Sequence, residues 1–263
     1  MKLSSANINV MVKACRKASK ILIRDFGEIE NLQVSLKGPG DFVTASDKKV
    51  EKILIDELQK ARPNYSILSE EIGKIDNDLS FKWIIDPIDG TANFLHGIPH
   101  FAISIGLEHN KEIICGIIFD PIKDEMFVAE KGNGAYLNNQ RIRVSGRSNL
   151  KDCMICTGGP SYYEEEKDKE LAMNEYKKFS SKVFLHVIKM GSASLDMAYV
   201  AAGRFDGMWQ RNLKHWDIAA GIILVKEAGG FVTDFAGNND YIENKTILVT
   251  NSRINGEMIE VLK

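Results

Sequence analysis

Residues 83–107 read WIIDPIDGTANFLHGIPHFAISIGL, and this stretch is the most informative part of the chain. Asp86 and Asp89 directly follow an apolar run, and a proline and a glycine beside them favour a turn that brings both carboxylates to the same end of a strand. Two hard oxygen donors suit Mg²⁺ better than Zn²⁺, and the Ile88 carbonyl offers a further oxygen. Taken alone, the segment is equally compatible with an ordinary Asp-Gly turn between strands.

The segments on either side extend a strand-like pattern. Short apolar runs continue to Val144 and are separated by turn signals, which predicts an antiparallel meander. Upstream, residues 4–26 and 47–61 have apolar side chains at helical spacing, with Ser46 as the expected N-cap of the second helix. Between those helices, a stretch with Gly38, Pro39 and Gly40 predicts a loop or hairpin. Residues 1–148 are therefore expected to form two helices packed on an antiparallel sheet.

The second half of the chain alternates between strand and helix patterns. Residues 149–263 are therefore expected to form a smaller α/β subdomain that packs closely on the first. The predicted strands lie near 153–157, 183–190, 205–211, 231–235 and 247–251, and the predicted helices near 162–180, 192–203, 216–230 and 254–262.

Bulk composition restricts the classes of protein. The 263 residues carry a formal net charge of −2, so bulk charge does not favour nucleic acid. Basic residues interrupt the N-terminal apolar pattern, and no run approaches ~18 apolar residues, so neither a signal peptide nor a membrane span is expected. We expect a cytoplasmic protein. Cys153 and Cys156 form a CxxC, but no second pair accompanies it, so buried free thiols are expected rather than zinc.

Three further acidic residues are candidates for the same site. Glu70 follows a short strand, where a solvated tip is the simpler interpretation. Asp217 begins an apolar helix, where it is either a capping carboxylate or a ligand, and the two are compatible. Asp47 lies in the first turn of a predicted helix, where capping is again the simpler interpretation.

The combination of these segments resembles the inositol monophosphatase family of lithium-sensitive, Mg²⁺-dependent phosphatases. Four motifs in the family's order carry the resemblance, and it extends over essentially the whole chain. They are DFVTASDKKVE (41–51), Ser69-Glu70-Glu71, WIIDPIDGTANFLHGIP (83–99) and HWDIAAGIILVKEAGG (215–230). The resemblance implies a layered αβαβα sandwich, with the active site between two subdomains.

The resemblance also implies roles for individual residues. One Mg²⁺ would be held by Glu70, Asp86 and the Ile88 carbonyl. A second would be held by Asp86, Asp89 and Asp217, and a third ion would lie near Glu70. Asp47 and Thr91 would polarise the attacking water. Gly90 and Thr91 would offer backbone N–H groups to the phosphate. Gly191, Ser192, Ala193 and Gln210 would lie near the alcohol part of the substrate. Metal-assisted in-line displacement accounts for a site rich in carboxylates without a Cys or Ser nucleophile.

Two positions depart from the family pattern. Ser69 stands where the family usually has Gly, and Gln210 stands where many inositol-specific members have Glu. Gln keeps hydrogen bonding and loses the charge, which weakens the expectation of strict inositol specificity. Inositol 1-phosphate is the leading substrate, and histidinol phosphate, fructose 1,6-bisphosphate and 3′(2′),5′-bisphosphate nucleotides are the alternatives. The resemblance further implies a homodimer and, as a competing role, a binding protein of RNA polymerase and its antitermination factors.

Overall fold

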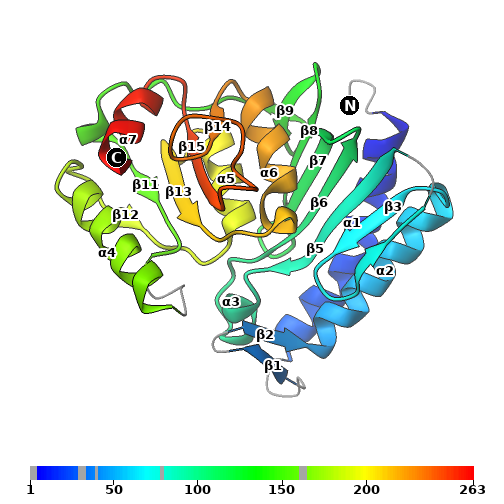
Figure 1. The fold of residues 1–263 in the computed structure, drawn as a ribbon. Helices are drawn as coiled ribbons and strands as arrows, with labels where there is room; N and C mark the ends of the chain where they lie inside the picture. Colours follow the sequence, from blue (N-terminus) through cyan, green and yellow to red (C-terminus); the bar gives the residue numbers. More distant parts are fainter. Residues whose placement is uncertain (1–4, 29–33, 39–40, 78–79, 160–164) are drawn as a thin grey trace.

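The computed structural model describes residues 5–28, 34–38, 41–77, 80–159 and 165–263. In these segments five layers follow one another: a helix pair, an eight-stranded sheet, a second helix pair, a five-stranded sheet and a third helix pair (Figure 1). The predicted αβαβα sandwich is confirmed. The helices of the first, third and fifth layers are α1 (Ala6–Phe26) with α2 (Ala45–Ala61), α5 (Ala193–Ala201) with α6 (His215–Glu227), and α4 (Glu166–Ser180) with α7 (Asn255–Leu262).

The larger sheet contains the predicted meander. Its strands are β3 (Ser66–Ser69), β4 (Gly73–Ile75), β5 (Phe81–Asp89), β6 (Ala102–His109), β7 (Glu112–Asp120), β8 (Glu125–Glu130), β9 (Gly134–Leu137) and β10 (Gln140–Ile142). They lie in the order β10-β9-β8-β7-β6-β5-β3-β4, and all neighbours are antiparallel except β3 and β5, which run parallel. Because β3 and β5 run in the same direction, Glu70, which follows β3, and Asp86 and Asp89, which lie in the last residues of β5, are at the same end of the sheet.

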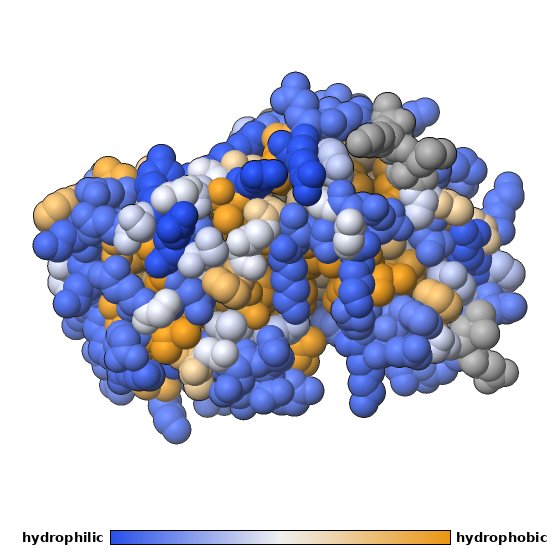
Figure 2. All heavy atoms as spheres, turned by 90° about the horizontal axis from the view of Figure 1, so that it is seen from above, coloured by the Kyte–Doolittle hydropathy of each residue, from blue (hydrophilic) through white to orange (hydrophobic). Residues whose placement is uncertain are grey.

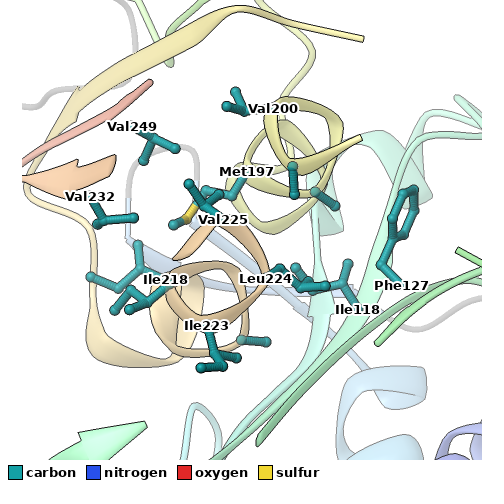
Figure 3. Close-up of a cluster of buried hydrophobic side chains, with 14 of the residues drawn as sticks. Ile118, Phe127, Met197, Val200, Ile218, Ile223, Leu224, Val225, Val232 and Val249 are labelled. Atoms are coloured by element: carbon teal, nitrogen blue, oxygen red, sulfur yellow. The ribbon is translucent and has the colours of Figure 1, made fainter. Parts of the chain in front are cut away.

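Alternate residues of the central strands enter two different cores. Ile85, Ile103 and Ile117 are fully buried against α1 and α2, whereas Ile84 and Ile118 pack on the other face against α5 and α6. Strands that are buried on both faces read as continuous apolar runs, as they do here. Figure 3 shows the second core, where Leu224 of α6 lies beside Ile118 of the sheet and Ile223 lies on the side of α6 away from Met197 and Val200 of α5.

A pair of glycines brings α6 close to the sheet. Gly106 of β6 and Gly116 of β7 are cross-strand partners. A Cβ at Gly116 would lie 2.6 Å from Ile223 Cγ2 and 2.7 Å from the Ala220 carbonyl oxygen, and one at Gly106 would lie 2.9 Å from Ala219 Cβ. The helix therefore rests on a flat patch of backbone that any larger side chain would fill.

The smaller sheet separates α5 and α6 from the outer helices. It consists of β12 (Val187–Ile188), β11 (Ile155–Cys156), β13 (Gly207–Arg211), β15 (Thr246–Thr250) and β14 (Phe231–Thr233), in that order. Cys153 lies in the core beneath α4 and α7, whereas Cys156 lies in the core around α5 and α6. Both cysteines are buried and free, as predicted, and burial raises the pKa of the Cys153 thiol to about 12.

Some local predictions need correction. Helix α2 begins at Ala45, so Ser46 is not its N-cap but lies inside the first turn and donates a 2.7 Å hydrogen bond to Asp25 Oδ2. The strand expected over 183–190 is only Val187–Ile188, because Phe184, 79% exposed, and its neighbours lie outside the sheet.

The remaining predictions for this part of the chain have mixed outcomes. The expected hairpin is present as β1 (Val34–Gly38) and β2 (Asp41–Thr44), and Pro39 and Gly40 lie outside the described residues. Division of the chain between residues 148 and 149 stays a prediction. Within the described segments, every helix is too short or too polar to cross a membrane.

Candidate active site

A bulge in β5 places the two carboxylates of the central motif. Asp86 is paired with Ser104 of β6 and Asp89 with Ala102, so β5 has one residue more than its partner between these pairs. In a regular strand, residues three apart point to opposite faces, and the extra residue changes this alternation. Pro87 occupies the bulge, where its missing N–H does not interrupt the ladder. Asp86 Oδ1 accepts the Ile88 N–H at 3.0 Å, which stabilises the bulge.

Asp89 is bound by the start of α5. Its Oδ2 atom accepts hydrogen bonds from the hydroxyl of Ser192 at 2.5 Å, from the Ser194 N–H at 2.7 Å, and from the Ser194 hydroxyl. The Ala193 N–H donates to Oδ1 at 3.3 Å. A carboxylate is well placed among free N–H groups at a helix start. The central motif is thereby joined to residues about a hundred positions later in the chain.

Asp217 reaches the site from the first turn of α6. Its Oδ2 atom accepts the Lys214 N–H at 2.7 Å, so it caps the helix, as the simpler interpretation predicted. The carboxylate also interacts electrostatically with Asp89 and Glu70. Capping and proximity to the other carboxylates therefore occur together.

Asp47 and Glu70 complete the group from the opposite side. Asp47, fully buried in the first turn of α2, lies 3.4 Å from Thr91 Oγ1 through its Oδ1 atom. The Thr91 hydroxyl also lies 2.9 Å from the Ile88 carbonyl oxygen. Glu70 directly follows β3, and its N–H donates to the Ile85 carbonyl of the parallel neighbour β5 at 3.3 Å.

Burial raises the pKa of three carboxylates of the group, and nearby negative charges raise the pKa of two of them further. Burial raises the pKa of Asp86 well above its usual range, and the charges of Glu70, Asp89, Asp217 and Asp47 raise it further. Burial and the nearby Asp89 charge likewise raise the pKa of Asp217 well above its usual range. For Asp89, burial raises the pKa, and the hydrogen bonds from Ser192 and Ser194 oppose that rise. The site concentrates negative charge that folding stability alone would avoid.

Two glycines with positive φ allow the surrounding loops to meet. Gly90 has φ +97°, and a Cβ there would lie 3.1 Å from the His100 carbonyl oxygen and 3.3 Å from that of Gly191. Gly191 has φ +89°, and a Cβ there would lie 3.0 Å from Asn93 Nδ2. The Asn93 amide donates to the carbonyls of His100 and Met190, both at 2.8 Å. This amide ties α3 (Thr91–Leu95) to the segment that precedes α5.

The chemistry of these donors fits a hard divalent cation. Buried carboxylates that repel one another need a counter-charge, and carboxylate and carbonyl oxygens are the ligands that Mg²⁺ prefers. In the described part of the chain, no three His, Cys, Asp or Glu side chains already converge as a ready metal-ligand group. Asp89 faces serine hydroxyls and Asp217 faces the Lys214 amide, so a bound cation would compete with these hydrogen bonds.

Gln210 lies apart from the carboxylate contacts given above. It is 4% exposed on β13, and a Cβ at Gly158 would lie 2.5 Å from its Nε2 atom. The sequence reasoning missed Ser194 and Asn93, although both belong to segments it had singled out. It also missed the buried Glu51, whose acidic side chain at an interior helix position was a usable signal.

Comparison with known proteins identifies the family. The model of the inositol monophosphatase family matches residues 5–263. The chain belongs to the inositol monophosphatase family. The inositol-1-monophosphatase of Rhizobium meliloti (strain 1021) is 50% identical over 260 residues, which cover 98% of this chain and 97% of that protein. The Nus factor SuhB of Escherichia coli (strain K12) is 39% identical over 251 residues, which cover 94% of this chain and 92% of that protein.

Solved structures agree with this assignment. The crystal structure of extragenic suppressor protein suhB from Bartonella henselae has a TM-score of 0.94 and 49% sequence identity, and the match covers 98% of this chain and 99% of that one. As an inositol monophosphatase family member, the protein is a phosphatase, a hydrolase of phosphate monoesters. Its candidate active site is the set of carboxylate side chains at the ends of β3 and β5 and at the starts of α2 and α6.

Proposed function

We propose that this protein hydrolyses phosphate monoesters of sugars and polyols in a Mg²⁺-dependent reaction, with inositol 1-phosphate as the leading substrate. The observation that carries the proposal is that buried Asp86 lies within electrostatic reach of Asp89 on its own strand and of three carboxylates from other parts of the fold, which are Glu70, Asp217 and Asp47. Membership of the inositol monophosphatase family supports the same reaction class.

The chain's own oxygen atoms account for the metal requirement. One Mg²⁺ would be held by Glu70, Asp86 and the Ile88 carbonyl. A second would be held by Asp86, Asp89 and Asp217, and a third ion would lie near Glu70. When bound, Mg²⁺ neutralises phosphate charge and activates water for in-line attack. These assignments are proposals, supported by the raised pKa values of Asp86 and Asp217, each of which is due to burial and to the charges of nearby carboxylates.

Other residues of the site would orient the reactants. The Thr91 hydroxyl, which lies beside Asp47 Oδ1, can donate to that carboxylate and accept from the attacking water. The backbone N–H groups of Gly90 and Thr91 would face the phosphate. Gly191, Ser192 and Ala193 would line the alcohol side, where Ser192 already contacts Asp89. Gln210 would contact a substrate hydroxyl.

The test is phosphate release from a panel of esters. The protein is treated with EDTA and then assayed with and without Mg²⁺ on inositol 1-phosphate, histidinol phosphate, fructose 1,6-bisphosphate and an adenosine 3′,5′-bisphosphate. We expect no turnover without Mg²⁺, full recovery on readdition, and the highest kcat/KM with inositol 1-phosphate. Asp86→Asn, which removes a proposed ligand of two Mg²⁺ ions, provides the inactive control. Full activity in metal-free buffer would refute the proposal.

Lithium sensitivity follows from the same proposal. Li⁺ is expected to inhibit by occupying the position formed by Asp86, Asp89 and Asp217. LiCl is titrated against KCl at equal ionic strength, because this comparison separates site occupancy from charge screening. Equal effects of the two salts would exclude the lithium site.

A role in transcription is a second candidate function. The observation that favours it is that several relatives, including the Escherichia coli protein, are named Nus factor SuhB. In that role a cytoplasmic homodimer would bind RNA polymerase, and the carboxylates would be dispensable. Binding of the wild type and of Asp86→Asn to purified RNA polymerase tests it, and sedimentation measures the oligomeric state. Absence of binding by both proteins would remove this candidate.

A further inference from the structure

A buried glutamate on α2 holds the turn that carries Glu70. Glu51 is 1% exposed, and its Oε1 atom accepts three hydrogen bonds. The Glu71 N–H donates at 3.0 Å, the Ile72 N–H at 3.2 Å, and the Ser69 hydroxyl donates as well. These donors come from Ser69 before Glu70 and from Glu71 and Ile72 after it, so one oxygen atom binds the turn on both sides of Glu70.

The backbone of Glu70 has a separate attachment to the sheet. Its own N–H donates to the Ile85 carbonyl of β5 at 3.3 Å. Glu70 is thus held by β5 through its main chain and by Glu51 through its neighbours. Charge-assisted hydrogen bonds to a carboxylate are stronger than neutral ones, and two backbone N–H groups would lose their partner without Glu51.

Helix α2 connects this turn to the other side of the site. Asp47 and Glu51 are four residues apart, so they lie on the same face of α2, one turn from each other. Asp47 lies beside Thr91, and Glu51 holds the turn of Glu70. A single rigid helix therefore sets the spacing between these two parts of the active site.

We propose that Glu51, together with the Ser69 hydroxyl, is a positioning residue that orients Glu70 for Mg²⁺ binding. This inference rests on the proposed function, because it assigns Glu51 to the support of a metal ligand. The Ser69 hydroxyl adds a side-chain donor to the two backbone N–H groups that Glu51 binds. Residues that orient metal ligands typically contribute about 10–100-fold to metal affinity or activity.

The test compares two buried glutamates on the same helix. Glu51→Gln keeps the shape of the side chain and removes its charge. Glu57→Gln is the matched control, because Glu57 is 9% exposed and pairs with Lys13 at 2.8 Å and Lys17 at 2.6 Å, away from the Glu70 turn. Mg²⁺ binding to each metal-free protein is measured by calorimetry without substrate, and the melting temperature and kcat at saturating Mg²⁺ are measured alongside.

We expect Glu51→Gln to weaken Mg²⁺ binding by about 10-fold or more, with kcat at saturating Mg²⁺ changed by less than about threefold. Glu57→Gln is expected to lower the melting temperature and to bind Mg²⁺ as the wild type does. If Glu51→Gln binds Mg²⁺ within about twofold of Glu57→Gln, Glu51 has only a structural role and the inference is overturned.

Two further outcomes are decisive. If Glu51→Gln does not fold, Mg²⁺ binding is measured with Ser69→Ala instead. We expect about threefold weaker binding from the loss of one hydrogen bond. Unchanged binding by Ser69→Ala would overturn the inference. If the wild type itself binds no Mg²⁺ and releases no phosphate, the proposed function fails and the inference fails with it. If the wild type binds Mg²⁺ and Glu51→Gln binds it equally well, the inference is overturned and the proposed function stands.

Discussion

At the scale of single residues, we expect Gln210 to influence how selective the site is. Its amide is buried on β13 and packs against Gly158, so its orientation is constrained by its surroundings. A glutamate at this position would accept hydrogen bonds from polyol hydroxyls with a full charge. The buried setting opposes that gain, because a carboxylate loses hydration there. We expect the balance between these two effects to influence the preference among phosphate esters.

We therefore expect Gln210→Glu to raise kcat/KM for inositol 1-phosphate relative to glycerol 2-phosphate. The gain corresponds to at most about 1.5–3 kcal/mol, the value of one hydrogen bond to a charged group. The Mg²⁺ requirement should not change, because Gln210 lies outside the proposed ligands. Gln140→Glu, at an exposed position on β10, provides the control. An unchanged ratio of the two kcat/KM values would show that Gln210 does not contact the alcohol.

At the scale of secondary-structure elements, the contact of α6 with β6 and β7 positions Asp217. The helix lies on the cross-strand pair Gly106 and Gly116, so its distance from the sheet depends on the absence of two Cβ atoms. Because Asp217 lies in the first turn of this helix, a displacement of α6 also moves the carboxylate relative to Asp86. Packing in the core and geometry in the site are therefore linked.

Gly116→Ala tests this link. The new methyl group would lie 2.6 Å from Ile223 Cγ2 and 2.7 Å from the Ala220 carbonyl oxygen, so α6 must shift. Overpacking of this kind costs about 1–3 kcal/mol. We expect that loss in the free energy of unfolding, measured by urea denaturation, together with weaker Mg²⁺ binding. Gly146→Ala is the control, since no atom lies within 4 Å of the added Cβ. Equal stability of the two variants would contradict the close contact.

At the scale of the whole molecule, the active site reduces the stability of the metal-free protein. Its carboxylates come from helices α2 and α6 and from the ends of strands β3 and β5. Burial and the charges of nearby carboxylates raise the pKa values of Asp86 and Asp217. A carboxyl whose pKa is raised on folding binds more protons in the folded than in the unfolded state between the two pKa values. Its contribution to stability is therefore lost as the pH rises above the unfolded value of about 4 and through the folded value.

Asp217→Asn should accordingly raise the melting temperature in EDTA at pH 8, by about 2–4 °C for each kcal/mol of relieved repulsion. At pH 4 this gain should disappear, because the wild-type carboxyl is then largely protonated in the folded state. With Mg²⁺ at pH 8 the order should reverse and turnover should fall severely. Asp240→Asn, at an exposed position, is the control. A lower melting temperature at every pH, with near-normal turnover, would identify Asp217 as a helix cap alone.

Local patterns in the sequence determined most elements and most candidate residues. Periodicity and turn residues predicted both helices of the first layer, the meander and the short strand before Glu70. The pair Asp86 and Asp89 followed from a strand that ends at Pro87 and Gly90. The family resemblance extended this set to Asp47, Thr91 and Asp217. The predictions of these helices and strands succeeded because they depend on side chains that are close in the sequence, and the roles of the candidate site residues stay predictions.

Only the tertiary structure decided how these pieces meet. The bulge opposite Ser104, the serine hydroxyls on Asp89 and the glycine pair beneath α6 all join segments that are far apart in the chain. Ser46 illustrates the limit, since its local pattern predicts a cap, yet its hydroxyl binds Asp25 of the neighbouring helix. Glu51 illustrates it further, because its three donors lie 18 to 21 residues away along the chain. Such contacts depend on strand register and helix packing, which local sequence patterns do not specify.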